Sequence, residues 1–337
     1  MRKNKFLYIA IAIVLILLVA SIAYTFMPRK NTYTLSDAAA MEDVGNIGPG
    51  DSNRQPVNPN QFTFAILGDT QMFYLKGAEG DFAKAVDSIE KEKPDLVMTV
   101  GDLIQSCDNE QECSAYKLWK NVTRPILGKT YEVMGNHDAG GEKISDKIWQ
   151  REFNLPTNGS AGYKELVYSF DYGNSHFVVL NSERPELHKI DDVQQKWLEN
   201  DLSNNRKENT FVFFHEPAFP INQHVGRSLD HYPEYRDPFW RILDKYNVTA
   251  VFNGHETING RRKVDSVAFP GAKNSIYQFI FGETDEFGRK DEPIAKNVDF
   301  YNKDNAYAMV KVNGKEITVD TYSAVNNNLI NSFTFSK

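Results

Sequence analysis

Acidic residues outnumber basic ones outside the first thirty positions of this chain, and no acid occurs within those thirty. The formal net charge of the 337 residues is −7, and residues 1–30 carry five Lys or Arg and no acid, which leaves −12 on the remainder. A body with this acidic balance argues against binding of nucleic acid through a broad basic face. The balance does not exclude a phosphate ligand, because a bound metal ion can invert the local charge.

Cysteine is scarce, because the chain has only two, Cys107 and Cys113. In an exported protein these residues could form a disulfide that closes a small loop, and the alternative is two unpaired thiols. The chain also lacks an internal repeat and a long low-complexity tract. Its hydrophobic fraction of 41% fits a globular protein with a sizeable core.

Residues 6–27 form an uninterrupted uncharged, mainly apolar stretch. At a rise of about 1.5 Å per residue it is long enough for a hydrocarbon core of about 30 Å. The short basic segment before it, residues 1–5, predicts a cytoplasmic N-terminus and an extracytoplasmic body. The alternative to this transmembrane anchor is a cleaved signal peptide, with a weak small-residue cleavage site at residues 21–23 and a secreted body.

Residues 28–60 are rich in Gly, Pro, Asn and Asp and show little apolar periodicity. This composition predicts a flexible linker that holds the body off the membrane. The folded domain is then expected over residues 61–337.

From Phe62 onward, short apolar runs alternate with amphipathic helical stretches. The expected strands are 62–69, 95–102, 130–138, a hairpin over 165–182, 211–217, 248–256, 276–283, 307–314, 315–322 and 329–336. The expected helices are 80–93, 114–127, 193–205 and 239–247. This order predicts an α/β body with central strands and outer helices, arranged as two packed sheets rather than one open parallel sheet.

Polar side chains that suit metal binding follow five of these strands. They are Asp69, Asp102, Asn136 with His137, His215 and His255. Because ligand sites form at the carboxyl ends of strands in α/β sheets, we expect these side chains at one edge. One such residue is usually a turn or a satisfied core group, but five with the same placement are hard to attribute to turns. Carboxylates and imidazoles bind Mn, Fe and Zn, whereas pure oxygen sites favour Mg or Ca.

Five short segments resemble the ordered motifs of the calcineurin-like metallophosphoesterases. They are GDTQ at 68–71, GDLI at 101–104, GNHD at 135–138, FHEP at 214–217 and GHET at 254–257. The resemblance implies a four-layer α-β-β-α sandwich of two mixed sheets flanked by helices, preceded here by the predicted transmembrane helix. It also implies a site for one or two divalent metal ions, drawn from Mn, Fe, Zn or Mg.

The resemblance implies a role for each matching residue. Asp69, with Gln71 beside it, would hold the first metal, and Asp102 would bridge the two metals. The remaining ligands of the second metal would be Asn136, His215 and His255.

His137 and Asp138 are the catalytic residues that the resemblance implies. His137 would lie beside the phosphate, where it would stabilise negative charge or protonate the leaving oxygen. Asp138 would pair with the ring of His137 and orient it.

Two positions depart from the motifs of the family. The usual first motif is Asp-x-His, where this chain has Gln71, and the usual last motif is Gly-His-x-His, where it has Thr257. Both missing histidines belong to the first metal, so that metal would be weakly held, a harder cation, or absent. Glu256 and His224 are possible substitute ligands.

A long polar and aromatic loop, residues 218–237, follows the fourth motif. It could contribute substrate contacts through His224, Arg227 or Arg236, because loops on a rigid scaffold often determine specificity. A plain surface loop is an equal alternative.

The expected function is hydrolysis of a phosphate mono- or diester, outside the cytoplasm, by attack of a metal-bound hydroxide. The first alternative is an attenuated protein of the same fold that binds a metal or a phosphorylated ligand without turnover. The second is a surface-exposed binding or adhesion module that keeps only the fold. The expected partners are a phosphate-ester substrate and the membrane, and not nucleic acid.

Overall fold

The computed structural model describes part of the chain, namely residues 44–45, 48–49, 55–71, 80–107, 113–140, 144–282, 295 and 297–337. The chain divides into two compact units, residues 1–32 and 33–337, and all described residues belong to the second unit. The predicted transmembrane anchor, residues 6–27, lies outside the described residues. None of the helices described is both long and apolar enough to cross a membrane.

The second unit alternates helices and strands before ending in strands. Its helices are α3 (Asp81–Glu92), α4 (Ser114–Leu127), α5 (Asn136–Ala139), α6 (Ile144–Glu152), α7 (Asp192–Asn204), the 3₁₀-helix η1 (Leu229–His231) and α8 (Pro233–Lys245). Its strands are β1 (Gln61–Leu67), β2 (Leu96–Thr99), β3 (Thr130–Tyr131), β4 (Tyr168–Tyr172), β5 (Ser175–Val179), β6 (Asn209–Phe213), β7 (Ala250–Asn253), β8 (Asn259–Val264), β9 (Ile276–Phe281), β10 (Phe300–Asn302), β11 (Ala306–Asn313), β12 (Glu316–Ser323) and β13 (Leu329–Ser336).

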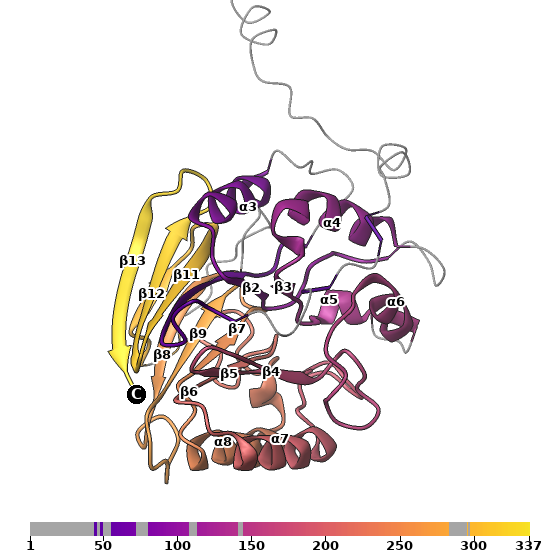
Figure 1. Ribbon diagram of the computed structural model, residues 1–337. Coiled ribbons are helices and arrows are strands. Elements are labelled where there is room, and N and C mark those ends of the chain that lie inside the picture. Colours follow the sequence, from indigo (N-terminus) through magenta and orange to yellow (C-terminus); the bar gives the residue numbers. More distant parts are fainter. Residues whose placement is uncertain are drawn as a thin grey trace, which may run out of the picture. The chain divides into compact units, whose positions relative to one another are not determined.

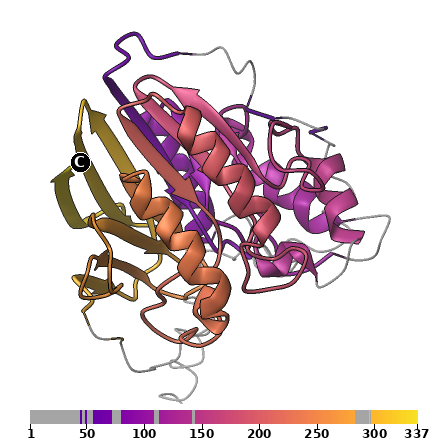
Figure 2. The ribbon, with the colours of Figure 1, turned by 90° about the horizontal axis from the view of Figure 1, so that it is seen from below.

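The strands form two mixed sheets. One has six strands in the order β13-β12-β11-β1-β2-β3, and the other has seven in the order β10-β8-β9-β7-β6-β5-β4. Within them β1, β2 and β3 run parallel, as do β5, β6, β7 and β9. Helices α3 and α4 lie outside the first sheet, and α7 and α8 lie outside the second (Figure 1). Seen from below, α7 and α8 lie side by side over the face of their sheet, roughly along its strands (Figure 2). The predicted pair of mixed sheets flanked by helices is confirmed.

A layer of phenylalanine rings fills the space between the sheets. Phe64 on β1 is fully buried and lies 5.3–6.3 Å, between ring centroids, from four rings of the other sheet. These rings belong to Phe177, Phe211, Phe213 and Phe252. Truncating a buried Phe to Ala typically costs about 3–5 kcal/mol. This layer therefore fixes the two sheets, and with them the strand ends, against each other.

The structure corrects the predicted strand over residues 130–138. Only Thr130–Tyr131 forms β3, and residues 136–139 make the single helical turn α5. The carboxylate of Asp138 accepts a hydrogen bond from the backbone N–H of Gly135 (2.9 Å), which turns the chain out of the extended conformation. Helix α8 starts at Pro233 rather than at residue 239, since proline suits the first turn of a helix.

Part of the predicted linker contacts the folded domain. The ammonium of Lys120 is buried and donates to the carbonyl of Gly45 (3.0 Å), while also pairing with Glu152 (2.7 Å). Val44 packs against the hydrophobic core. The composition of this segment gave no indication of these contacts.

Candidate metal centre

The residues expected at one edge of the sheets do meet there. Asp69 follows β1, Asp102 follows β2, and Asn136 lies at the turn after β3. From the other sheet, His215 follows β6 and His255 follows β7. Because the contributing strands of each sheet run parallel, their carboxyl ends bring these side chains together.

Several of these residues have a strained backbone. The φ angles of Asp69, Gln71, Asp102 and His255 are 47°, 37°, 52° and 70°, in the left-handed region that side chains rarely adopt. Such residues cost roughly 1–3 kcal/mol each and cluster at functional sites, where the surrounding structure holds them.

The glycines before Asp102 and His255 are explained by close approach. A Cβ atom on Gly101, whose φ is 98°, would lie 2.4 Å from Nδ1 of His215. A Cβ atom on Gly254 would lie 2.3 Å from Oδ2 of Asp69. No larger residue fits at either position without displacing a side chain of the centre.

Four side-chain atoms of kinds that bind metal ions lie close together in the middle of the centre. Oδ1 of Asn136 lies 3.0 Å from Nε2 of His215 and 2.9 Å from Nδ1 of His255. Oδ2 of Asp102 lies 3.3 Å from the same Nε2 of His215. The ligand atoms of Asp102, His215 and His255 all lie within 4.8 Å of one another.

Backbone carbonyls fix which nitrogen of each histidine faces the centre. Nδ1 of His215 lies 2.8 Å from the carbonyl of Val100, and Nε2 of His255 lies 3.1 Å from the carbonyl of Arg227. Each of these nitrogens must donate, because a carbonyl only accepts. In a neutral His255 the lone pair of Nδ1 then points at the oxygen of Asn136. Burial alone would lower the pKa of His215, but the charge and hydrogen bond of Asp102 hold it well above its ordinary value, so Nε2 of His215 also donates, toward Asn136 and Asp102.

The close approach of His215 and His255 to the Asn136 oxygen tests whether a cation fits the site. Burial, together with the neighbouring imidazoles of His215 and His224, holds the pKa of His255 well below its ordinary value, so His255 is neutral. Its Nδ1 lone pair and the Asn136 oxygen would repel each other with nothing between them. A divalent cation resolves the conflict, since imidazole nitrogen, amide oxygen and carboxylate are all accepted ligands. The residues present therefore fit a metal ion.

Asp102 contacts more residues of the centre than a single hydrogen bond requires, since both of its oxygens have partners there. Its Oδ1 accepts from the backbone N–H of His137 (2.9 Å), and its Oδ2 faces both His215 and the amide of Gln71 (3.3 Å). Burial alone would raise the pKa of Asp102, but the charge and hydrogen bond of His215, with the charge of His137, hold it well below the ordinary value. The carboxylate is therefore ionised, as a shared metal ligand must be.

The other half of the centre has oxygen and amide groups but no imidazole. Both oxygens of Asp69 accept from the backbone N–H of His255 (3.0 Å each). Gln71 presents its amide nitrogen to Asp102, and the hydroxyl of Thr257 accepts from Gln223 (2.6 Å). Across the described part of the chain, no second cluster of three His, Cys, Asp or Glu residues surrounds this half.

The structure places His137 beside the centre but gives it a different partner from the one predicted. Its Nδ1 lies 3.1 Å from the carbonyl of Gln105, and its Nε2 lies 4.0 Å from Oδ2 of Asp102. About a third of its side chain (32%) is exposed, so the Nε2 edge is accessible to a substrate.

The expected pairing of Asp138 with the ring of His137 is wrong. Asp138 is buried, and its carboxylate accepts from the backbone N–H groups of Leu103, Ile104 and Gly135 and from the hydroxyl of Tyr116. Burial, followed by the charge of Asp102, raises its pKa to about 7. Asp138 therefore joins two loops, and the ring of His137 is oriented by a backbone carbonyl instead.

Glu256 and His224, the possible substitute ligands, lie at different positions in the structure. Both oxygens of Glu256 accept backbone N–H groups, from Ile221 (2.8 Å) and Asn222 (2.7 Å), so Glu256 holds the loop after the fourth motif. The ring of His224 stacks on that of His255 at 4.1 Å between centroids. Its buried Nδ1 has no hydrogen-bond partner, and burial, with the charges of His215 and Arg227, lowers its pKa to about 4.

The two arginines of the same loop have different positions. Arg227 contributes its backbone carbonyl to His255. Arg236 pairs with the neighbouring Asp237 (2.7 Å) and lies over the ring of Phe219. Of the three candidate side chains of this loop, His224 is thus the one that contacts a residue of the centre.

The groups that sequence reasoning missed are mostly backbone atoms. The carbonyls of Val100, Gln105 and Arg227 set the orientation of three histidines, and a carbonyl has no residue identity by which to recognise it. Tyr116 was missed because nothing in the sequence distinguishes it from an ordinary tyrosine of the hydrophobic core.

Two packed mixed sheets with a metal-ligand cluster at their carboxyl edge define the class of metallophosphoesterase-like α/β sandwiches. The chain belongs to the calcineurin-like phosphoesterase family, whose model matches residues 62–258. Proteins of this family use dinuclear metal centres, and this chain holds the buried group Asp102, His215 and His255.

Curated relatives include plant phosphatases. Purple acid phosphatase 21 of Arabidopsis thaliana is 28% identical over 223 residues, covering 62% of this chain and 47% of that protein. Purple acid phosphatase 13 of the same plant is 30% identical over 146 residues, covering 41% and 26%. The chain thus spans about half, or less, of the length of these relatives.

Solved structures share the fold. Purple acid phosphatase PPD1 from yellow lupin (Lupinus luteus) has a TM-score of 0.66 at 17% identity, over 84% of this chain and 55% of its own. PhoD has a TM-score of 0.64 at 16% identity, over 84% and 71%. GAP50, titled the anchor in the inner membrane complex of Plasmodium, has a TM-score of 0.63 at 14% identity, over 82% and 89%.

Proposed function

We propose that this chain hydrolyses phosphate mono- or diesters with one or two divalent cations bound at the carboxyl edge of its sheets. The observation that carries the proposal is the convergence of His215, His255 and Asn136, in which Nε2 of His215 (3.0 Å) and Nδ1 of His255 (2.9 Å) both face the Asn136 oxygen. We propose Asp102 as the shared ligand and Asp69 with Gln71 as the ligands of the other half. Cations held there would neutralise charge on the phosphoryl oxygens and activate the attacking water.

His137 is the residue proposed to act on the substrate. With Nδ1–H donated to Gln105, Nε2 carries a second N–H only when the ring is protonated, and it can then donate a hydrogen bond to a phosphoryl oxygen or a proton to the leaving oxygen. The neutral ring of His224 covers one face of His255, which shields this ligand from solvent. Asp138 and Glu256 keep the surrounding loops in place.

We also propose that the domain is anchored in a membrane by residues 6–27 and lies outside the cytoplasm. The basic start and apolar stretch of the sequence favour this topology. The disulfide between Cys107 and Cys113 supports it, because disulfides persist mainly in oxidising compartments. A topology reporter fused after Lys337 should be active only outside the cytoplasm, and activity inside would refute the proposed location.

A second candidate function is ligand binding without turnover. Gln71 and Thr257 stand where the family motifs have histidines, and the hydroxyl of Thr257 is already bonded to Gln223. GAP50, which shares the fold, is described as an anchor, so this fold also serves in a protein with an anchoring role. The observation that favours turnover over this second function is the set of candidate metal ligands around Asn136, namely His215, His255 and Asp102.

Metal analysis combined with turnover separates the two functions. The purified full chain should contain bound metal and should hydrolyse chromogenic mono- or diesters, lose that activity with a chelator and regain it when the metal is restored. A chain that is fully loaded with metal and yet inert on both ester classes would refute the enzymatic proposal and favour the binding function.

A further inference from the structure

Two loops of the centre are joined by the buried carboxylate of Asp138. Its Oδ2 accepts from Gly135 (2.9 Å) and Leu103 (3.2 Å), and its Oδ1 accepts from Ile104 (3.3 Å). Leu103 and Ile104 lie between Asp102 and Gln105, whose carbonyl orients His137. The position of the Gln105 carbonyl therefore depends on how this loop is held.

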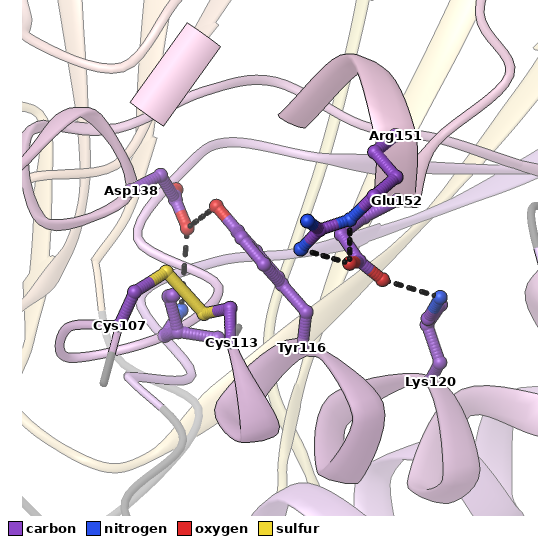
Figure 3. The surroundings of a disulfide bond; sticks show 8 residues. Cys107, Cys113, Tyr116, Lys120, Asp138, Arg151 and Glu152 are labelled. Atoms are coloured by element: carbon purple, nitrogen blue, oxygen red, sulfur yellow. Dashed lines mark hydrogen bonds and ion pairs between the residues drawn. A yellow bond between two sulfur atoms is a disulfide. The ribbon is translucent and has the colours of Figure 1, made fainter. Parts of the chain in front are cut away.

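Helix α4 supplies a third partner to the same carboxylate. The hydroxyl of Tyr116, in the first turn of α4, donates to Oδ1 of Asp138 (3.0 Å), and the Tyr116 side chain is buried (Figure 3). Its ring packs edge-on against Trp149 of α6 and against Phe153, which directly follows α6, at 6.1 and 5.3 Å between centroids. Tyr116 is thus a rigid donor with little freedom to move.

A disulfide ties the same loop to the same helix. Cys107 lies two residues after Gln105, and Cys113 directly precedes the first residue of α4. Figure 3 shows the disulfide beside the hydrogen bond between Tyr116 and Asp138. Because the stabilisation from a disulfide grows with the loop it closes, a link across six residues constrains local geometry more than overall stability.

We propose that the Cys107–Cys113 disulfide and Tyr116 form a brace that positions His137 through the carbonyl of Gln105. The disulfide holds the end of the loop, and Tyr116 holds its middle through Asp138. This inference rests on the proposed function only for its kinetic consequence. Its structural consequence, the hydrogen bond from Nδ1–H of His137 to Gln105, can be measured without turnover.

Tyr116→Phe tests the brace by removing a single hydroxyl. The matched control is Tyr172→Phe, because the buried Tyr172 donates to Asp95 (3.1 Å) at the opposite, amino end of the strands. In nitrogen-15 NMR of the full chain, wild type and Tyr172→Phe should show a Nδ1–H signal of His137 that is protected from exchange. Tyr116→Phe should weaken or abolish that protection. Equal protection in all three proteins would refute the contribution of Tyr116.

The disulfide is tested by reduction and by substitution. A dithiol reductant gives two electrons and two protons to the sulfurs, which become two thiols while the reductant closes to a cyclic disulfide. The Cys107→Ser/Cys113→Ser variant also lacks the disulfide, and it needs no dithiol, which would itself bind metal. Both treatments should remove the protection of His137. Unchanged protection in both would refute the role of the disulfide.

Turnover supplies the second readout. Tyr116→Phe should lower kcat roughly 10- to 100-fold on esters with poor leaving groups, with KM and metal content little changed, because small misplacements of a catalytic group are costly. In a His137→Ala background the same substitution should have no further effect, whereas a purely structural role would lower activity equally in both backgrounds. An inert wild type would refute the proposed function, and the NMR comparison would still decide on the brace.

Discussion

The two ends of the strands place histidine in opposite surroundings. At the amino end of β5, His176 lies between two carboxylates, with Nδ1 2.7 Å from Asp171 and Nε2 2.7 Å from Asp201. At the carboxyl end, His215 and His255 donate outward to backbone carbonyls and turn their remaining nitrogens toward an amide oxygen. In the first arrangement both ring nitrogens face carboxylates, and in the second two ring nitrogens face the same amide oxygen.

The charges of the histidines follow from these surroundings. Burial would lower the pKa of His176, but its hydrogen bonds and charge interactions with Asp171 and Asp201 raise it to about 9. Burial and two neighbouring imidazoles lower the pKa of His255 far below the ordinary value. His176 is thus a cation at one end of the strands, and His255 is neutral at the other.

Removing an imidazole at the carboxyl end should have the largest effect on metal binding. His215→Ala or His255→Ala removes one nitrogen donor, so we expect metal affinity to fall by at least about 100-fold. Turnover should be lost with the metal. Elemental analysis after dialysis measures the effect, with His176→Gln as the matched control that keeps its metal. Unchanged metal content in both alanine variants would show that the cluster is not a metal site.

His137→Ala should affect chemistry without affecting the metal. The side chain contributes no donor to the convergent set, and help from a general acid is typically worth about 10²–10⁴-fold in rate. We expect turnover of esters with poor leaving groups to fall by that factor, with metal content and fold retained. The loss should shrink for substrates with very acidic leaving groups. Full activity on a poor leaving group would contradict the assigned role.

His176→Gln should affect stability without affecting the metal. The pKa of His176 is about 9 in the folded chain against an ordinary 6.5, so its stabilisation is fully present below pH 6.5 and is lost as the pH rises toward 9. The shift corresponds to up to about 3 kcal/mol at pH 6. Urea unfolding of both proteins at pH 6 and pH 9 should show a difference that shrinks with pH. A difference that grows with pH would contradict the ion-pair account.

Restoring imidazoles to the poorer half of the centre should have the smallest effect. Gln71→His with Thr257→His replaces an amide and a hydroxyl by two nitrogen donors. We expect zinc affinity at this half to rise on the order of tenfold, about 1.4 kcal/mol. Isothermal titration of metal-free protein measures it, with Gln71→Asn/Thr257→Ser as a control that adds no imidazole. Two equally tight sites in the wild type would mean that a ligand of this half has been missed.

The sequence was informative where a residue type and a strand end coincide. Asp69, Asp102, Asn136, His215 and His255 could be placed at one edge because parallel strands bring their carboxyl ends together. The two packed sheets followed from the order of the expected strands and helices, and the resemblance to the family implied that both sheets are mixed. The alternation of apolar runs and amphipathic stretches was less reliable after β3, where the side chain of Asp138 bonds to the backbone and ends the strand early.

The sequence was uninformative where partners are backbone atoms or distant neighbours. Adjacency suggested that Asp138 orients His137, but successive side chains point in different directions, and the orienting group is the carbonyl of Gln105. Nothing in residues 218–237 distinguished His224 from the arginines beside it. The fold does so, because the Glu256 carboxylate fixes the loop that carries His224 onto His255.

Anomalous diffraction from crystals of the metal-loaded chain tests the central claim most directly. A peak is expected within about 2.0–2.2 Å of the nitrogens Nε2 of His215 and Nδ1 of His255, beside the oxygens of Asp102 and Asn136. A weaker peak, or none, is expected beside Asp69 and Gln71, and none between His176 and its carboxylates. Crystals that contain stoichiometric metal but show no peak between His215 and His255 would contradict the account.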